Sequence, residues 1–224
     1  MTTPVDVVRV FTDDDGRFGN ELGVIRASEE TVGREQSIAL ELGFSETVFL
    51  EGVDDGVATI RIFTPASELP FAGHPSVGTA WWLSSLGTPV SVLREKAGDV
   101  AVRYDGDLTW ITGRAEWAPE FQWHALASAA EVDALDGAAF PDGKHYLWAW
   151  VDEAAGVLRS RMFAPSLGVP EDEATGAAAV RLTAQLGRNL TIRQGAGSRI
   201  TTRLRDGGLV DVAGRTVFDR AITI

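Results

Sequence analysis

The sequence predicts an α+β protein made of two structurally equivalent halves, and three observations lead to this expectation. Residues 61–87 and 161–187 match at a constant spacing of 100 residues without a gap, with Arg, Phe, two Pro and a final Leu-Gly in common. Each segment is predicted to form a strand, then a loop bounded by prolines, then a helix that ends at Gly. Short β-branched runs separated by turn signals occupy much of the rest. A repeat with this order of elements favours duplication of one unit.

The remaining elements follow from local patterns. A helix is expected over residues 29–42, because apolar residues recur on one face and Gly43 follows as a cap. The helix at residues 75–86 has almost no polar face, so we expect it inside the core. Residues 54–56, Asp-Asp-Gly, should turn a hairpin. Strands are expected at residues 5–11, 47–50, 57–63, 90–93, 100–104, 108–112, 190–193, 200–204 and 209–212. We place the two halves at residues 1–113 and 114–224 and allow them to exchange a terminal strand.

Composition excludes several kinds of function. The 224 residues carry 20 basic and 32 acidic side chains, a net charge of −12, so nucleic acid is not an expected partner. The absence of cysteine excludes disulfides, thiolate catalysis and Cys-ligated metals. The three histidines, His74, His124 and His145, are not spaced as metal ligands, so no metal site is expected.

The chain has no pattern of a membrane protein. Its first thirty residues lack a basic segment followed by an apolar one, and no apolar run approaches 18 residues. We therefore expect a cytoplasmic protein without membrane contact.

Two equivalent loops lead into the helices of the repeat and carry the candidate site residues. The first contains Gly73 and His74, and the second contains Asp172, Thr175 and Gly176. Facing helix N-termini with small residues could bind a carboxylate or an enolate, because they present free N–H groups. Spacing alone equally allows plain helix caps. In that case Asp172 would be no more than an N-cap.

Glu46 stands between a helix end and the apolar strand that includes Val48 and Phe49. A half-buried carboxylate at such a junction would have a raised pKa suited to a general base. A surface glutamate before a strand is the alternative, and the pattern by itself favours it.

Several motifs occur in an order that resembles the phenazine-biosynthesis-like (PhzF) family. The resemblance runs from about residue 5 to residue 215, and the block at residues 69–75 is its most specific part. The motifs are Gly19-Asn20, Ser45-Glu46-Thr47, Glu68-Leu69-Pro70-Phe71-Ala72-Gly73-His74-Pro75, Glu171-Asp172 with Ala174-Thr175-Gly176, and Gln194-Gly195.

The resemblance implies the diaminopimelate-epimerase fold, with two pseudo-symmetric halves that each wrap a β-barrel-like sheet around a central helix. It implies that Glu46 is the general acid/base, with His74 and Asp172 as proton-handling partners in the cleft. The implied substrate-binding residues are Asn20, Gly73, Thr175 and Gly176. It also implies a cofactor-free enzyme and, together with seven Trp residues, a homodimer.

The expected function is therefore a cofactor-independent isomerase or epimerase that acts on a small carboxylate-bearing metabolite. The chain is shorter than typical family members, and it has Glu21 and Glu173 where the family often has Pro, and Ala177 where it often has Ser. The alternative is a catalytically silent protein on the same fold that binds a small anion.

Overall fold

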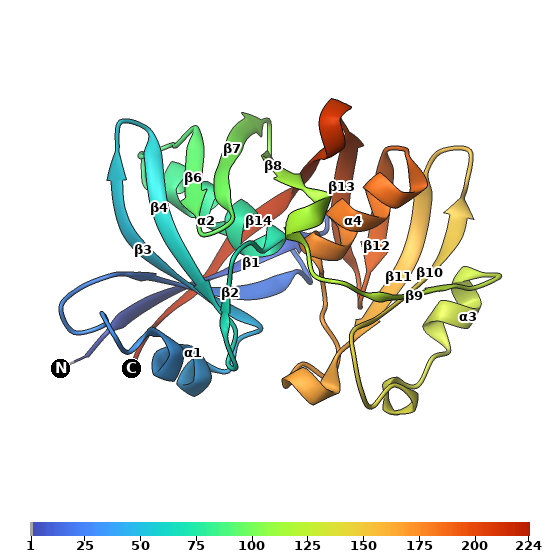
Figure 1. The fold of residues 1–224 in the computed structure, drawn as a ribbon, viewed down its shortest axis with the longest axis horizontal. Coiled ribbons are helices and arrows are strands. Elements are labelled where there is room, and N and C mark those ends of the chain that lie inside the picture. The colour runs from blue at the N-terminus through green and yellow to red at the C-terminus, as the bar shows by residue number, and fades with distance from the viewer. Residues whose placement is uncertain (1) are drawn as a thin grey trace.

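The first half of the molecule is a closed β-barrel. The computed structural model describes residues 2–224, and its strands form one continuous sheet that closes where β1 pairs with β14 (Figure 1). Both chain ends lie on this barrel. Its strands, in order around the ring, are β1 (Pro4–Thr12), β2 (Asn20–Arg26), β3 (Glu46–Asp54), β4 (Val57–Phe63), β6 (Val92–Glu95), β7 (Gly98–Asp105), β8 (Leu108–Arg114) and β14 (Leu209–Thr223).

The second half continues the same sheet but does not close. The order beyond β14 runs β13, β12, β11, β10, β9, and among the described strands β9 pairs only with β10. A two-residue strand, β5 (Glu68–Leu69), pairs with β4 in the first half. The strands of the second half are β9 (Gln122–Ala125), β10 (His145–Asp152), β11 (Val157–Phe163), β12 (Leu190–Gln194) and β13 (Ser198–Leu204).

Strand directions repeat between the halves. From β2 to β8 the successive pairs are parallel, antiparallel, parallel, antiparallel and antiparallel, and the pairs from β9 to β14 follow the same sequence. This confirms the prediction of two pseudo-symmetric halves. The long β14 connects them, because residues 209–214 pair with β8 and residues 215–223 pair with β1. The expected boundary after residue 113 lies within β8 and stays a prediction.

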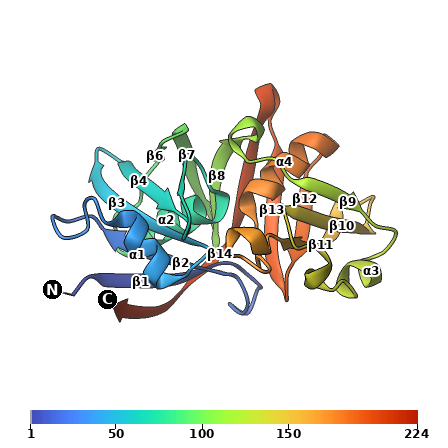
Figure 2. The same ribbon diagram turned by 60° about the horizontal axis from the view of Figure 1, so that its bottom comes forward.

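Each half wraps its strands around one buried helix, α2 (Gly73–Ser85) or α4 (Gly176–Leu186) (Figure 1; Figure 2). Ten of the 13 residues of α2 are buried, which explains why its sequence has almost no polar face. Side chains from both helices and both sets of strands form one hydrophobic core. A smaller cluster packs under α1 (Glu35–Leu42), and a short helix α3 (Ala129–Asp133) covers β10 and β11.

The two central helices meet at their N-termini. A Cβ placed on Gly73 would lie 2.7 Å from the carbonyl carbon of Gly176, and one placed on Gly176 would lie 2.9 Å from the Cα of Gly73. Only glycine allows this approach. The first residues of α2 and α4 are 103 positions apart, whereas β4 and β11 are 100 apart. The gap-free alignment of residues 61–87 with residues 161–187 is therefore correct for the strands. It is wrong for the loops before the helices, because these loops differ in length.

The helix predicted over residues 29–42 begins only at Glu35. Residues 28–34 form turns instead, in which Thr31 Oγ1 accepts a hydrogen bond from the Ser28 N–H at 2.8 Å, and the Arg34 N–H donates to the Thr31 carbonyl at 3.0 Å. Such local bonds to a hydroxyl compete with helix formation. The hairpin at residues 54–56 and the cap at Gly43 are confirmed. No helix among residues 2–224 is long and apolar enough to span a membrane.

Replacement of Gly73 by alanine tests the contact between the helix ends. The added methyl group would press on the Gly176 backbone, so we expect Gly73→Ala to lower the free energy of unfolding by about 1–3 kcal/mol. Gly52→Ala is the control, because a Cβ there meets nothing within 4 Å, and it should change stability by less than about 0.5 kcal/mol. Urea unfolding measures both. Equal stability of the two variants would contradict the close approach.

Candidate active site

Three titratable side chains from both halves meet at the junction of the central helices. Glu46 is the first residue of β3, His74 is the second residue of α2, and Asp172 lies in the loop before α4. The distance from His74 Nδ1 to Glu46 Oε2 is 3.4 Å. The side chains of Glu46 and His74 are 15% and 3% exposed, and Asp172 is 8% exposed. The fold thus shields all three side chains from most of the solvent.

Asp172 is held by two of the predicted binding residues. The Asn20 side-chain amide donates to Asp172 Oδ1 and also to the Ala174 carbonyl, the latter at 3.2 Å. The Thr175 hydroxyl donates to Asp172 Oδ2 at 2.7 Å. Thr175, not Asp172, occupies the N-cap position of α4. The alternative that Asp172 serves only as a helix cap is therefore wrong.

Parallel pairing of β2 with β3 explains why Asn20 lies beside Ser45, the residue before Glu46. Asn20 and Glu46 begin their strands, and parallel strands start at the same edge of a sheet. Ser45, just before β3, donates its hydroxyl hydrogen bond to Asn20 Oδ1 at 3.3 Å. Glu46 Oε2 is buried and has no hydrogen-bond partner within residues 2–224. A buried carboxylate oxygen without a partner is typical of an atom that faces a ligand.

Gln194 is a supporting residue that motif reasoning noted but did not place in the site. Its amide group donates to the Asp172 carbonyl at 2.9 Å and to Thr175 Oγ1 at 2.8 Å. Its Oε1 accepts from the Thr175 N–H at 3.2 Å and from Tyr146 OH at 3.1 Å. This fully buried side chain fixes the loop that carries Asp172. The only sequence signal for it was the pair Gln194-Gly195.

Glu173 stands where the family resemblance implies a proline. Its side chain links two loops through hydrogen bonds. Its carboxylate accepts hydrogen bonds from the Ala196 N–H at 2.8 Å, the Gly197 N–H at 3.2 Å and the Ser198 hydroxyl at 2.8 Å. It therefore ties the loop before α4 to the turn between β12 and β13. Ala177, another of the three departures, lines the cavity described next.

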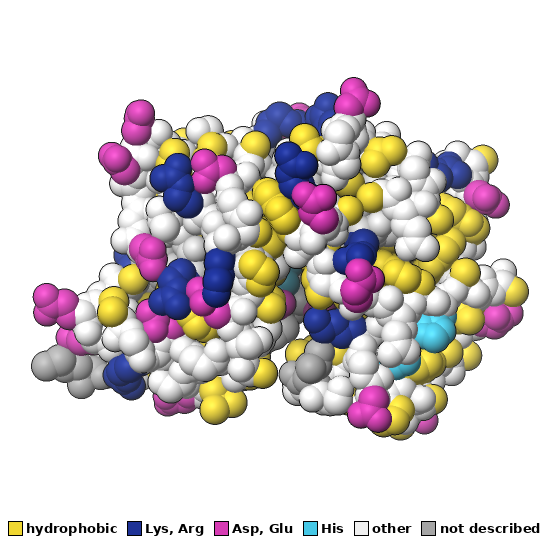
Figure 3. All heavy atoms as spheres, viewed as in Figure 1, with side chains coloured by type: hydrophobic (Ala, Val, Ile, Leu, Met, Phe, Trp, Pro, Cys, Tyr) yellow, Lys and Arg dark blue, Asp and Glu magenta, His cyan; other side chains and the backbone are white. Residues whose placement is uncertain are grey.

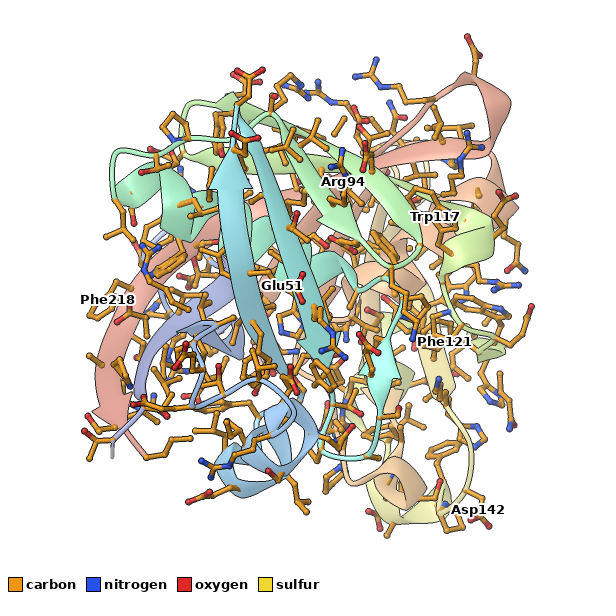
Figure 4. All side chains as sticks on the ribbon, turned by 60° about the vertical axis from the view of Figure 1, so that its left-hand side comes forward. Glu51, Arg94, Trp117, Phe121, Asp142 and Phe218 are labelled. Carbon is orange, nitrogen blue, oxygen red and sulfur yellow. The ribbon has the colours of Figure 1, made fainter. Side chains whose placement is uncertain are left out.

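A cavity of about 330 Å³ lies between the halves and reaches Glu46 and Asp172. This volume suits a small metabolite. Hydrophobic side chains gather along the junction on the face shown in Figure 3. Trp117 and Phe121, labelled in Figure 4, come from the segment between β8 and β9. The apolar wall includes Leu69, Phe71, Trp117, Phe121, Met162 and Val169.

Burial shifts the acid–base properties of the cluster. Desolvation raises the pKa of Glu46 to about 7 and lowers the pKa of His74 to about 4. Burial, followed by the charge of Glu46, raises the pKa of Asp172 to about 6. At neutral pH His74 is therefore neutral, while Glu46 exchanges readily between its acid and its carboxylate. A group with a pKa near the working pH is well suited to accept and return a proton.

Glu95, another buried carboxyl group, supports the N-terminus of α2. Ser76 Oγ lies 2.6 Å from Glu95 Oε1 and 2.7 Å from the Ala72 carbonyl, and burial raises the pKa of Glu95 to about 8. A hydroxyl has one proton and cannot donate to both acceptors. Glu95 is therefore protonated at neutral pH and donates to Ser76, which donates to Ala72. This chain of bonds holds the first turn of α2, where His74 lies.

The arrangement of the two halves defines the fold class. Two barrel-like halves, each around a central helix, are the architecture of the diaminopimelate-epimerase-like fold. The structure of a hydroxyproline epimerase from Agrobacterium vitis superposes with a TM-score of 0.62 at 14% identity, covering 100% of this chain and 92% of that one. Within residues 2–224, no group of three or more His, Asp or Glu side chains, the cluster of Glu46, His74 and Asp172 included, has an arrangement that could hold a metal ion.

The chain belongs to the phenazine biosynthesis-like (PhzC-PhzF) protein family, whose model matches residues 8–147 and 145–212. The trans-2,3-dihydro-3-hydroxyanthranilate isomerase of Pseudomonas aeruginosa is 31% identical, over 79% of this chain and 77% of that relative. A PhzF-family structure from Enterococcus faecalis has a TM-score of 0.79 at 21% identity, covering 100% of this chain and 99% of the other. The chain is thus an isomerase of this family, as the motifs predicted.

The protonation of Glu95 predicts a pH-dependent stability. Between its ordinary pKa of 4.5 and the raised value of about 8, the folded protein keeps a proton that the unfolded chain releases. The contribution of Glu95 to the free energy of unfolding therefore falls as pH rises through this window. Glu95→Gln removes the titration, so relative to wild type it should gain on the order of 2–4 kcal/mol between pH 5 and pH 8.5.

Urea unfolding at the two pH values measures this effect. The exposed Glu41→Gln is the matched control and should show no such gain. A difference between wild type and Glu95→Gln that is the same at both pH values would contradict a protonated Glu95.

Proposed function

We propose that this isomerase moves a proton within a small carboxylate-bearing substrate, with Glu46 as the general acid/base and without a metal or organic cofactor. The observation that supports this most is the position of Glu46. It is a buried carboxyl group with an unpartnered oxygen, beside His74 and close to Asp172, in the cavity between the halves.

In the proposed reaction the Glu46 carboxylate removes a proton from a carbon next to the carboxylate or conjugated system of the substrate. The electron pair of the broken C–H bond spreads into that system as an enolate-like charge. Protonated Glu46 then returns the proton to another carbon on the same face. Composition and charge are unchanged overall, so no co-reactant is needed. The N-terminal amides of α2 and α4, at Gly73 and Gly176, would stabilise the developing charge.

His74 is the rival base, and the electrostatics of the cluster favour Glu46. A pKa of about 4 makes His74 a weak base at neutral pH, whereas a pKa of about 7 matches Glu46 to the task. We assign His74 and Asp172 to binding and to handling the proton beside Glu46. Asn20 and Thr175 fix Asp172 through the bonds described above and complete the proposed binding set.

A silent anion-binding protein on the same fold is the second candidate. The observation that favours it is Ala177 in the cavity wall, which has no hydroxyl to offer a ligand. The two candidates differ in whether the protein exchanges substrate hydrogen with solvent. The homodimer and the cytoplasmic location expected from the sequence stay predictions.

Glu46→Gln should separate the candidates. The amide keeps the shape of the side chain but cannot take a proton, so turnover should fall by roughly 10²- to 10⁴-fold while binding persists. Deuterium incorporation from heavy water into trans-2,3-dihydro-3-hydroxyanthranilate, the compound in the name of the Pseudomonas relative, is the first measurement, followed by other small carboxylic acids.

Two further variants complete this experiment. Glu51→Gln, an exposed position on the same strand, should exchange as wild type does. His74→Ala should weaken binding and turnover together. Normal exchange by Glu46→Gln, with exchange abolished and binding intact in His74→Ala, would make His74 the base. Ligand binding by wild type without any exchange would favour the silent protein.

A further inference from the structure

We propose that Gln194 and Tyr146 are positioning residues for the proton transfer. Through the Thr175 hydroxyl they hold Asp172 as a carboxylate, so that the proton available to the two carboxyl groups of the site resides on Glu46. This inference rests on the proposed function and deepens it, because it states which of two neighbouring carboxyl groups carries the proton. Tyr146 belongs to neither the duplicated loops nor the family motifs.

Backbone groups fix the orientation of the Gln194 side-chain amide. A backbone N–H can only donate a hydrogen bond, and a backbone carbonyl can only accept one. The Thr175 N–H lies 3.2 Å from one end of the amide, and the Asp172 carbonyl lies 2.9 Å from the other. The amide oxygen must therefore face the Thr175 N–H, and the NH2 group must face the Asp172 carbonyl. The Tyr146 hydroxyl, 3.1 Å from the same amide oxygen, adds a second donor there.

This orientation gives the bond between Thr175 and Asp172 a fixed direction. The Gln194 NH2 group donates to Thr175 Oγ1 at 2.8 Å, so the single proton of that hydroxyl goes to Asp172 Oδ2 at 2.7 Å. To accept a bond from a protonated Asp172, the Thr175 hydroxyl would have to turn its own proton away from both partners. The Asn20 NH2 group, which also donates to the Ala174 carbonyl, faces Oδ1 and cannot accept a bond. Hydrogen bonds of this kind favour the charged form of a carboxyl group.

Tyr146, on β10, secures this arrangement from behind Gln194. Its phenol is fully buried, and burial raises its pKa, so the phenol keeps its proton at neutral pH. Gln194 Oε1 has no proton, hence Tyr146 donates to it, and Ser160 Oγ, 2.9 Å from the phenol oxygen, donates to Tyr146 in turn. The donors therefore run in one direction, from the hydroxyl of Ser160 to the carboxylate of Asp172.

Glu95 in the first half occupies the position equivalent to Gln194. The two residues end β6 and β12, and these strands pair in parallel with β4 and β11, which are 100 residues apart. Each side chain bonds to a hydroxyl at the start of its central helix, Ser76 for Glu95 and Thr175 for Gln194. The Gln194 amide does not titrate, whereas Glu95 does. The second half therefore keeps its donors fixed over the whole pH range in which Glu46 changes charge.

Asp172 is the carboxyl group of the site that holds its charge more easily. Burial, followed by the charge of Glu46, raises its pKa to about 6. The charge of His74 and the hydrogen bond from Thr175 oppose this rise. Both oxygens of Asp172 accept a hydrogen bond from the protein.

Glu46 has less support for its charge. Burial raises its pKa to about 7 against the opposing effects of Ser45 and Lys144. Its buried Oε2 has no hydrogen-bond partner in the described part of the chain. When two carboxyl groups repel each other, a single proton goes to the one whose charged form is less well hydrogen-bonded. At this site that group is Glu46.

Carbon-13 NMR of aspartate carboxyl groups tests the proposal without a substrate, with the Asp172 resonance identified by its loss in Asp172→Asn. Gln194→Met removes the donor to Thr175 and frees that hydroxyl to accept a bond from a protonated Asp172. The pKa of Asp172 should then rise by about 1–2, the range of one hydrogen bond to a charged group. Tyr146→Phe removes one of the two donors that orient Gln194, and it should raise the same pKa by about 0.5.

The chain offers a matched control for each variant. Gln36→Met also removes a glutamine amide that donates to two backbone carbonyls, at 2.9 and 3.0 Å. Tyr104→Phe also removes a phenol, one that donates to a backbone carbonyl at 3.1 Å. These bonds do not involve Asp172, so both controls should leave its pKa unchanged. A merely structural role of Gln194 and Tyr146 would likewise lower stability without moving that pKa.

Circular dichroism and the melting temperature establish which variants are folded. An Asp172 pKa in folded Tyr146→Phe or folded Gln194→Met that equals the value in its control overturns the proposal. If Gln194→Met does not fold, Tyr146→Phe decides alone. The same rise is expected when Tyr146→Phe is combined with Glu46→Gln, whether or not Glu46 transfers the proton. The proposed function and this inference can therefore fail separately.

Discussion

The end-to-end contact between the two central helices is the constraint on which the site depends. Gly73 and Gly176 touch through their backbones, and this contact brings His74 of α2 next to the loop that carries Asp172. The same contact fixes the separation of the two halves and hence the width of the cavity. A side chain at either position would push the helices apart. The two glycines therefore matter through the space that they leave, not through any chemistry of their own.

Because the two halves pack closely, the acid–base groups between them are desolvated. This desolvation shifts their pKa values. Burial moves the pKa of Glu46 up and the pKa of His74 down, so that both groups are largely uncharged or readily neutralised. Desolvation of a carboxylate costs folding free energy, and the site recovers little of it through hydrogen bonds to Glu46. A protein retains such a cost where function requires it.

The sequence predicted the parts of the fold and the site that local patterns encode. The repeat revealed the two halves, and the junctions between its loops and its buried helices contained His74, Asp172, Thr175 and Gly176. It did not reveal β2, because Glu21 and Gly23 interrupt the alternation expected of a strand. The helix expected from residue 29 began late because hydroxyl groups formed turns, which periodicity does not detect.

The sequence did not predict the positions of residues that depend on contacts between segments far apart in the chain. Gln194 reaches Asp172 because β12 pairs with β11, which leads into the loop before α4. Tyr146 reaches Gln194 because β10 pairs with β11, and β11 pairs with β12. Neither relation leaves a local signal in the sequence. Glu95 is similar, since its partner Ser76 lies 19 residues earlier in the chain.

Burial between the halves gives Glu46 the pKa of a general base. Carbon-13 NMR of glutamate carboxyl groups, compared between wild type and Glu46→Gln, measures that pKa without any substrate. The resonance missing from the variant should titrate with a pKa of about 7 in the wild-type protein. Titration of that resonance near the ordinary value of 4.5 would mean that burial does not prepare Glu46 as a base.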